Sequence, residues 1–300
     1  MARVSGSKRA WAFQCIQIRS GGHDFEGLLY VAKVPFIIVD LINLNEIEID
    51  VNKRIAWVQS RATVGELYYR IGEKSKTLGF PTGVYPTVGI DGHFSGGGYG
   101  LLMRKYGLAA NNVIDAHIID VNSKLLDRES IGEDLFWAIR GGGGASFGVI
   151  VAWKVKLVSV PSTLMVSQVN ITLEKNATQI IHMWQFLTNK IDEGLGINIV
   201  LHKVNLSKKK EFTIEAVFQS LFLEGVDELL HLMQKNFPKL GSKREDCTGM
   251  SWVESLLYLF GLGGQPLELL LNRTQAIMGS FKTKSDFLRN LIPETGLEGL

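Results

Sequence analysis

One stretch near the start of the chain combines a single histidine with three glycines: Arg19-Ser20-Gly21-Gly22-His23-Asp24-Phe25-Glu26-Gly27. Because glycine has no Cβ, the backbone at such positions can turn tightly and can approach a flat ligand closely. A histidine on this loop can face an electrophile or a cofactor. The alternative interpretation is an Asp/Gly turn that carries an incidental surface histidine.

Two further glycine-rich stretches lie downstream, at residues 81–100 and 137–149. A dinucleotide-binding motif needs G-x-G-x-x-G between a strand and a helix, but the third glycine would be Ser146 in one stretch and Leu101 in the other. The phosphate-binding pattern G-x-x-x-x-G-K-[ST] does not occur in the sequence. Backbone N–H groups in tight turns remain, and these can still bind a pyrophosphate.

Together the three segments resemble the flavin-binding domain of the plant berberine bridge enzyme-like oxidases, which belong to the vanillyl-alcohol oxidase superfamily with a PCMH-type FAD-binding domain. The resemblance extends from about Ile16 to the last residue. Its most specific parts are the first two glycine loops and the run EDLFWAIRGG at 133–142. It implies a cofactor, FAD, and hydride transfer from an alcohol, sugar or alkaloid to the flavin, with dioxygen as the acceptor. The flavin would carry the redox chemistry and the protein would position it.

The resemblance also implies roles for individual residues. His23 matches the histidine that is bonded to the 8α-methyl carbon of the flavin. Tyr85 stands where doubly attached members have a cysteine, so FAD should be covalently held through His23 only. The residues expected at the cofactor are His23, Arg19, Ser20, Gly21, Gly22, Asp24, Val88, Gly89, Gly92, His93, Ser95, Gly96, Gly97, Gly143, Gly148 and Val149.

Val88, His93 and Tyr99 each carry an alternative interpretation. Val88 falls at the position that controls oxygen access in the family and favours an oxidase, although it could also simply be packed. His93 has no assigned chemistry, and structural hydrogen bonding is the simpler interpretation. Tyr99 matches a tyrosine at the substrate face of the flavin and is the candidate catalytic residue, or else a core plug.

Arg61 and Asp91 replace glycines of the family. If either backbone required φ > 0, the strain would be on the order of 1 kcal/mol or more. We therefore expect these two charged side chains to weaken flavin binding. No metal site is expected.

The catalytic base of relatives, a tyrosine or glutamate, comes from strands beyond the equivalent of Leu300. Relatives also have an N-terminal flavin-binding segment and a C-terminal segment that returns to the flavin domain. The resemblance therefore implies a chain truncated at both ends. A catalytically inactive flavin-binding remnant, or the product of an incomplete gene, is the alternative to an active oxidase. A sugar-binding module without flavin would leave the glycine loops unexplained.

The predicted fold class is α+β, with two domains. A PCMH-type FAD-binding domain without its N-terminal part would occupy residues 1–160. A partial substrate-binding domain, an antiparallel sheet backed by helices, would occupy residues 161–300. Expected strands are 36–41 (buried), 55–59, 113–121, 149–160, 166–173, 196–204 and 212–219, and expected helices are 133–139, 177–191 and 225–235.

A further helix is predicted to begin after Thr63, because Glu66 completes a capping-box pattern. Its buried stripe would consist of Val64, Leu67, Tyr68 and Ile71, and Gly79 would end it. This is the most detailed local prediction that the sequence supports.

The resemblance implies a small-molecule substrate and dioxygen as partners, and the bulk properties do not suggest others. A net charge of +2 does not support nucleic-acid binding, and Lys208-Lys209-Lys210 reads as a solvated loop. No apolar run approaches the about 20 residues that span a bilayer. Cys15 and Cys247 are the only cysteines; they could pair, but they form no disulfide framework. The sequence leaves the oligomeric state open.

The four sequons begin at Asn170, Asn176, Asn205 and Asn272 and favour a glycoprotein on the secretory route. By family resemblance the expected location is secreted, in the cell wall or in the vacuole. Residues 1–19 lack the apolar core and small-residue cleavage site of a signal peptide.

Overall fold

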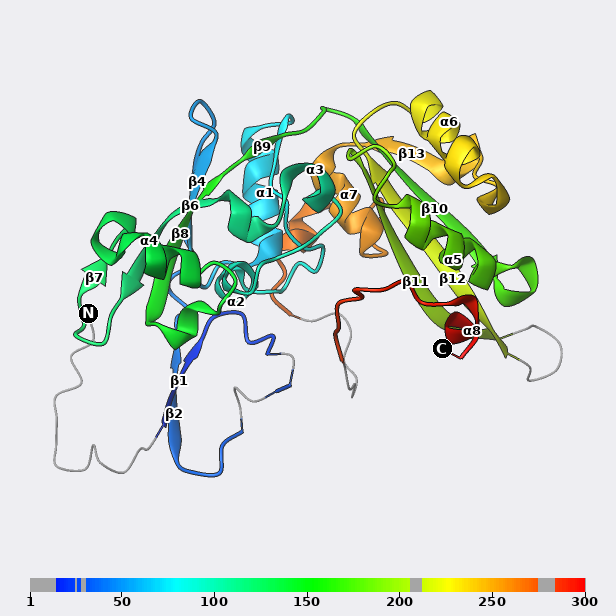
Figure 1. Cartoon of the computed structure of the whole chain (residues 1–300). Helices are drawn as coiled ribbons and strands as arrows, with labels where there is room; N and C mark the ends of the chain where they lie inside the picture. The colour runs from blue at the N-terminus through cyan, green and yellow to red at the C-terminus, as the bar shows by residue number, and fades with distance from the viewer. Residues whose placement is uncertain (1–14, 25, 28–30, 206–211, 275–283, 300) are drawn as a thin grey trace.

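The computed structural model describes residues 15–24, 26–27, 31–205, 212–274 and 284–299. Two sheets dominate it, one in each half of the molecule, and helices pack on both (Figure 1). The mixture confirms the predicted α+β class. The run Lys208-Lys209-Lys210 and Phe25 lie outside the described residues.

The first half is built on a five-stranded antiparallel sheet in the order β3-β4-β8-β6-β7. At its centre Trp153 lies between Val58 and Ala116, and all three are fully buried. The strands are β3 Ile47–Asp50, β4 Ile55–Gln59, β6 Val113–Ile119, β7 Leu125–Leu126 and β8 Val149–Lys156. The predicted strand at 149–160 is therefore two strands, because β8 ends at Lys156 and the short β9 (Val158–Ser159) pairs with β5 (Leu78–Gly79) instead.

Helix α1 (Val64–Lys74) covers this sheet and begins as predicted. Thr63 and Glu66 form the reciprocal capping box, and the stripe of Val64, Leu67, Tyr68 and Ile71 is buried. Its predicted end was wrong. The helix stops at Lys74 because Ser75 is extended, and Gly79 lies in β5.

The remaining helices of this half are short. They are α2 Ile90–Ser95, α3 Met103–Tyr106, the 3₁₀ turns η3 Ala109–Asn112 and η4 Gly144–Ser146, and α4 Arg128–Ala138. α4 begins five residues before the predicted start at 133, because the Asp127 side chain caps the amide of Ser130. A kink at Gly132 (φ 75°) separates this first turn from the rest.

Strands β1 (Cys15–Arg19) and β2 (Phe36–Asp40) form a separate parallel pair below the main sheet (Figure 1). A strand at 36–41 was predicted to be buried, and this was wrong. The exposed fractions of Ile37, Ile38 and Val39 are 40%, 40% and 43%. Among the described residues β2 pairs with β1 alone, and its apolar side chains remain partly exposed.

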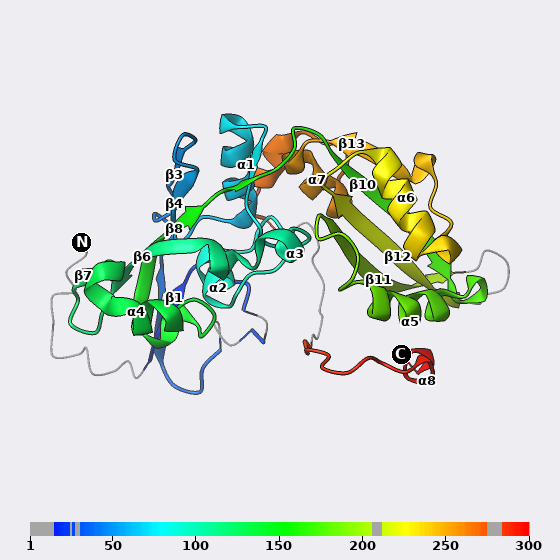
Figure 2. The same cartoon turned by 45° about the horizontal axis from the view of Figure 1, so that its top comes forward.

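The second half contains a four-stranded antiparallel sheet in the order β11-β12-β10-β13. Helices α5 and α6 cover one face of it (Figure 2), where Ile180 and Met233 pack against Phe218. The elements are β10 Leu164–Thr172, η5 Leu173–Lys175, α5 Ala177–Leu187, β11 Leu195–Asn205, β12 Phe212–Phe222, α6 Val226–Asn236, η6 Pro238–Leu240, η7 Arg244–Asp246 and β13 Cys247–Met250.

The chain then returns to the first half. Helix α7 (Trp252–Leu259) buries Trp252 and Leu256 in the first hydrophobic core, and η8 (Leu267–Leu271) packs on α1. The last helix, α8 (Glu294–Glu298), lies beside α5, where Gln185 and the backbone of Ile292 exchange two hydrogen bonds. The domain boundary near residue 160 stays a prediction.

Arg104 of α3 connects the two halves. Its guanidinium donates to the carbonyl oxygens of Ile191, Asp192 and Leu195 at 2.8, 2.8 and 2.6 Å, at the start of β11. The pKa of Arg104 is lowered by burial, and nearby Asp192 opposes this shift. A half-buried cation that bonds three carbonyls fixes the two halves against each other at this point.

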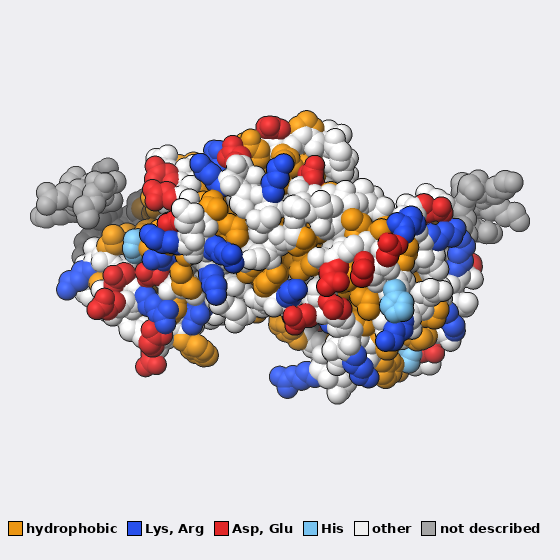
Figure 3. Space-filling view, turned by 90° about the horizontal axis from the view of Figure 1, so that it is seen from above, with side chains coloured by type: hydrophobic (Ala, Val, Ile, Leu, Met, Phe, Trp, Pro, Cys, Tyr) orange, Lys and Arg blue, Asp and Glu red, His pale blue; other side chains and the backbone are white. Residues whose placement is uncertain are grey.

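Cys15 and Cys247 are both free thiols, so they do not pair in this structure. Acidic and basic side chains are interspersed over the face shown in Figure 3. Within the described ranges, no helix combines the length and apolar character needed to cross a membrane.

Candidate cofactor site

Helix α2 lies where the three glycine-rich loops meet. Gly89, its N-cap, touches Gly21 so closely that a Cβ at Gly21 would stand 2.3 Å from the Gly89 nitrogen. At the other end of α2, the carbonyl of Ser95 accepts hydrogen bonds from Gly141 and Gly143 at 2.9 and 3.0 Å. The three segments that the sequence singled out are therefore neighbours in space.

The glycines of these loops fall into two groups. At Gly21, Gly89 and Gly148 a Cβ would meet backbone atoms at 2.3 to 2.5 Å, so these glycines let chain segments touch each other. At Gly92 a Cβ would meet no atom within 4 Å, and at Gly143 (φ 86°) the nearest is the Ser146 hydroxyl at 3.9 Å. These two glycines leave open space over the backbone, which is what the approach of a flat cofactor requires.

The other loop residues that the sequence analysis placed at the cofactor take part in backbone hydrogen bonds, glycine turns or strand pairing in this structure. The Gly96 amide bonds the Gly92 carbonyl at 3.1 Å, and Gly97 adopts φ 112°. Gly22 adopts φ 76°, and Val149 pairs with Ile119 at the start of β8. The carbonyl of Asp24 accepts a hydrogen bond from Gly27 at 3.2 Å.

His23 lies against the second glycine-rich stretch. Its Nε2 lies 2.8 Å from the hydroxyl of Thr87, and its ring meets the ring of Tyr85 edge-on at 5.8 Å. Burial lowers the pKa of His23, and a contact with the backbone of Thr87 opposes this only in part. The imidazole is therefore neutral at pH 7, so a ring nitrogen retains the lone pair that bond formation requires.

Tyr85 is packed among aromatic groups. Its ring contacts Phe260 edge-on at 4.8 Å as well as His23, so the residue bridges the first loop and the end of α7. Thr87 and Phe260 were missed in the sequence. Only the nearness of Thr87 to Val88 could have suggested the first, and no sequence signal pointed to the second.

Arg19 and Ser20 anchor the base of the first loop. The Ser20 hydroxyl donates to the carbonyl of Ser60 at 2.5 Å. Asp40 bridges two arginines, with Arg19 at 3.3 Å and the buried Arg61 at 3.0 Å. Arg61 therefore has a carboxylate partner, an arrangement that the sequence did not predict.

The expected backbone strain at Arg61 and Asp91 is not found. Within the described ranges, the non-glycine residues with positive φ are Arg54, Ser123 and Asn176. Asp91 lies in the first turn of α2 in helical conformation. Its burial raises the pKa of the carboxyl to about 7, and the indole of Trp153 opposes this shift.

His93 has a structural partner. Its Nε2 accepts a hydrogen bond from the backbone N–H of Gly83 at 3.1 Å, and burial lowers the pKa of His93 to about 4. The ring also lies against Gly98, where a Cβ would approach it to 3.2 Å. This supports the interpretation of His93 as a hydrogen-bonded structural residue.

Tyr99 and Val88 differ in exposure. The Tyr99 side chain is 68% exposed, so it is not a core plug. Val88 is half-buried and packs on the first core, while its carbonyl accepts a hydrogen bond from Val64 at 2.9 Å. Packing against the core accounts for the partial burial of Val88.

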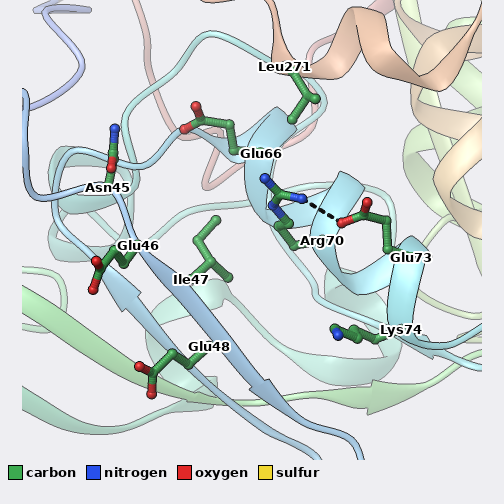
Figure 4. Close-up of a pocket in the computed structure, with 9 residues that line it drawn as sticks. All are labelled: Asn45, Glu46, Ile47, Glu48, Glu66, Arg70, Glu73, Lys74 and Leu271. Atoms are coloured by element: carbon green, nitrogen blue, oxygen red, sulfur yellow. Dashed lines mark hydrogen bonds and ion pairs between the residues drawn. The ribbon is translucent and has the colours of Figure 1, made fainter.

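A hollow of about 900 Å³ lies elsewhere, between β3 and α1 (Figure 4). Charged side chains line it, including Glu48, Lys74 and the ion pair of Arg70 with Glu73 at 2.7 Å. It contains none of the glycine-loop residues. We therefore locate the candidate site from the converging loops and not from this hollow.

The chain is similar to known FAD-binding proteins. Residues 10–128 match the family model described as an FAD binding domain. The chain is 50% identical to Berberine bridge enzyme-like 18 of Arabidopsis thaliana, over 95% of this chain and 52% of the relative. It is 51% identical to a tetrahydroberberine oxidase of Berberis wilsoniae, over 95% and 54% respectively.

The chain is also similar to solved structures. Berberine bridge enzyme from Eschscholzia californica matches with a TM-score of 0.88 and 43% identity, over 95% of this chain and 56% of that one. The BBE-like protein #28 from Arabidopsis thaliana matches with a TM-score of 0.85 and 47% identity, over 95% and 57%. The chain belongs to the berberine bridge enzyme-like family of FAD-binding proteins. It spans about half the length of the curated relatives it matches.

Proposed function

We propose that this chain is the flavin-holding part of an FAD-dependent oxidoreductase that removes a hydride from an alcohol, a sugar or an alkaloid and passes the electrons to dioxygen. The observation that carries the proposal is the convergence of the three glycine loops on α2, with open space over Gly92 and Gly143 and a neutral His23 beside them. When bound, FAD supplies the redox chemistry, and the protein supplies attachment and position.

We propose that His23 alone carries the cofactor covalently. The lowered pKa of His23 keeps its imidazole neutral, and the Thr87 hydroxyl fixes the ring. Tyr85 stands beside His23, and a phenol cannot form the thioether that a cysteine forms there in doubly attached relatives. The remaining predicted loop residues would contribute backbone amides and space.

Variants of berberine bridge enzyme support the placement of these residues. Solved structures of that enzyme include alanine variants of two histidines, one glycine and one cysteine. The spacings between these positions equal those between His23, Gly83, Tyr85 and His93 in this chain. Two histidines and a glycine thus coincide, and Tyr85 falls in the place of the cysteine.

The glycine variant of that enzyme is a reticuline dehydrogenase. By this spacing we propose that Gly83, together with Val88, controls how dioxygen reaches the flavin in this protein. The proposal supplements the assignment of this role to Val88 alone. The exposed phenol of Tyr99 is proposed to contact the substrate.

The substrate class is tested by anaerobic mixing. Flavin-loaded protein is mixed with a panel of oligosaccharides, aromatic alcohols and alkaloids while the visible flavin absorbance is followed. Bleaching by one of these substrates supports the oxidoreductase. Bleaching by dithionite alone would support the alternative of an inactive flavin-binding protein. Grass pollen allergen Phl p 4, to which the chain is 42% identical with a TM-score of 0.85, has glucose dehydrogenase activity, so glucose is included.

We also propose that the protein passes through the secretory route as a glycoprotein. Asn170, Asn176, Asn205 and Asn272 are all exposed, so each acceptor asparagine is accessible to a glycosyltransferase. Expression in a secreting eukaryotic host should give a product whose mass falls after glycosidase treatment. No mass change would contradict this proposal.

A further inference from the structure

Helix α2 joins the loops of the candidate cofactor site to the core beneath them. Its first end touches Gly21 of the first loop through Gly89, and its last residue, Ser95, holds Gly141 and Gly143 of the third loop. The helix packs on β4 and β8 of the main sheet. Any displacement of α2 therefore moves both glycine loops at once.

A carboxyl group on the first turn of this helix, that of Asp91, lacks a full set of partners among the described residues. Asp91 Oδ1 is buried and has no hydrogen-bond partner among the described residues, and the same holds for Trp153 Nε1. The indole of Trp153 is nonetheless close enough to favour the charged carboxylate, although burial of Asp91 acts more strongly in the opposite direction. Leaving a buried carboxylate incompletely bonded is costly, whereas the neutral acid is tolerated more easily.

We infer that Asp91 makes the seating of α2, and with it the order of the two glycine loops, dependent on pH. As a neutral acid the Asp91 side chain stays packed beside Trp153. As a carboxylate it favours arrangements in which the group reaches water, and α2 loosens. Only the consequence for FAD rests on the proposed function; the effect on α2 does not.

Other charged groups near α2 do not supply this dependence. His93 on the same helix accepts a bond from Gly83 and gains a proton only near pH 4. Arg61, just after β4, is paired with Asp40. On β8, the Lys154 ammonium lies over the ring of Trp57 at 5.3 Å.

The remaining neighbours of α2 are neutral or titrate lower. The adjoining turns η3 and η4 contain only Ala, Asn, Gly and Ser. His23, on the touching loop, has a lowered pKa and is already neutral above its ordinary value of 6.5. Among these groups, Asp91 is the one that changes charge near pH 7.

The sign of the effect follows from proton linkage. The pKa of Asp91 is about 7 in the folded chain against an ordinary value of 3.8. The neutral acid therefore stabilises α2 fully below about pH 4, and this stabilisation is lost as the pH rises through about 7. The cofactor loops should be better ordered in acidic than in alkaline medium.

Hydrogen exchange measured by mass spectrometry tests this directly, on the full chain at pH 5.5 and pH 8, with rates corrected for intrinsic exchange. In the wild-type protein, we expect the amides of residues 90–97 to open roughly tenfold or more readily at pH 8. Asp91→Asn and Asp91→Gly should remove this difference. Asp134→Asn, at an exposed aspartate on α4, should keep it.

A second readout concerns the flavin. The fluorescence of bound flavin should rise at pH 8 in the wild-type protein and stay constant in both Asp91 variants. If the wild type and both variants show the same pH dependence of exchange at residues 90–97, the inference is overturned. Because the exchange measurement needs no flavin, a protein that fails to bind FAD would contradict the proposed function and leave the inference on α2 fully testable. The two substitutions serve as mutual replacements should one of them impair folding.

Discussion

The backbone N–H of Gly83 donates a hydrogen bond to Nε2 of His93 at 3.1 Å, and a Cβ at Gly83 would stand 3.2 Å from the same ring. This separation is tighter than ordinary van der Waals contact, so an alanine side chain at Gly83 must displace the His93 ring. The two residues therefore act as one unit between the second glycine loop and α2.

Gly83→Ala is expected to slow the reaction of reduced flavin with dioxygen, because the added methyl group narrows the space at the loop and shifts His93. The measurement is stopped-flow reoxidation of dithionite-reduced protein by air-saturated buffer. His93→Ala and the double variant complete a thermodynamic cycle. If the double variant equals the sum of the two single effects, the residues do not act as a unit.

Arg104→Ala is expected to destabilise the chain by about 2–4 kcal/mol, because three carbonyl groups lose a charged donor. Arg104→Lys should recover only part of this, since an ammonium cannot reproduce the geometry of the guanidinium. Lys105→Ala, at the exposed neighbouring position, is the matched control and should change stability by less than about 0.5 kcal/mol. Equal denaturation midpoints for the Arg104 and Lys105 variants would contradict the connecting role of Arg104.

Residues 1–300 expressed alone are expected to aggregate through the β1–β2 pair. Ile37, Ile38 and Val39 are partly exposed on a strand that has one partner among the described residues, and such edges invite further pairing. Ile38→Lys should reduce aggregation, as judged by light scattering after gel filtration. A monodisperse wild-type chain with a sharp, reversible melt would show that this edge is not a liability.

Local signals in the sequence predicted local structure well. The start of α1 was readable because Thr63 and Glu66 bond each other within one turn. In the second half, β10, α5, β11, β12 and α6 were predicted to within four residues, because their hydrophobic patterns face a core. The sequence analysis did not predict β13, α7 or α8. The start of α4 was missed because its cap, Asp127, precedes a glycine that interrupts the pattern.

Properties that depend on distant partners could not be read in the same way. Ile37 to Val39 have the sequence of a buried strand, but burial depends on which segments cover it. The bond between His23 and Thr87 and the ion pair of Arg61 with Asp40 each join loops far apart in the chain. The burial of Asp91 likewise follows from how α2 docks on Trp153, which no local pattern contains.

The place of FAD attachment can also be changed by design. Tyr85→Cys should add a second covalent bond to the flavin if the thiol reaches the cofactor as the family cysteine does. Tyr85→Phe, which keeps the packing on Phe260, is the matched control and should leave attachment at one site. Proteolysis followed by mass spectrometry distinguishes one flavinylated peptide from a cross-linked pair. A singly attached Tyr85→Cys variant would contradict the placement of Tyr85 beside the flavin.

The central claim is that FAD is held covalently by His23 and by no other residue. The most direct measurement is peptide mass spectrometry of the flavin-loaded protein, combined with acid precipitation of the wild type and of His23→Ala. We expect the flavin mass on the peptide that contains His23, a coloured wild-type precipitate, and complete release of FAD from the variant. Complete release of FAD from the wild-type protein, or a flavin found on a different peptide, would contradict the account.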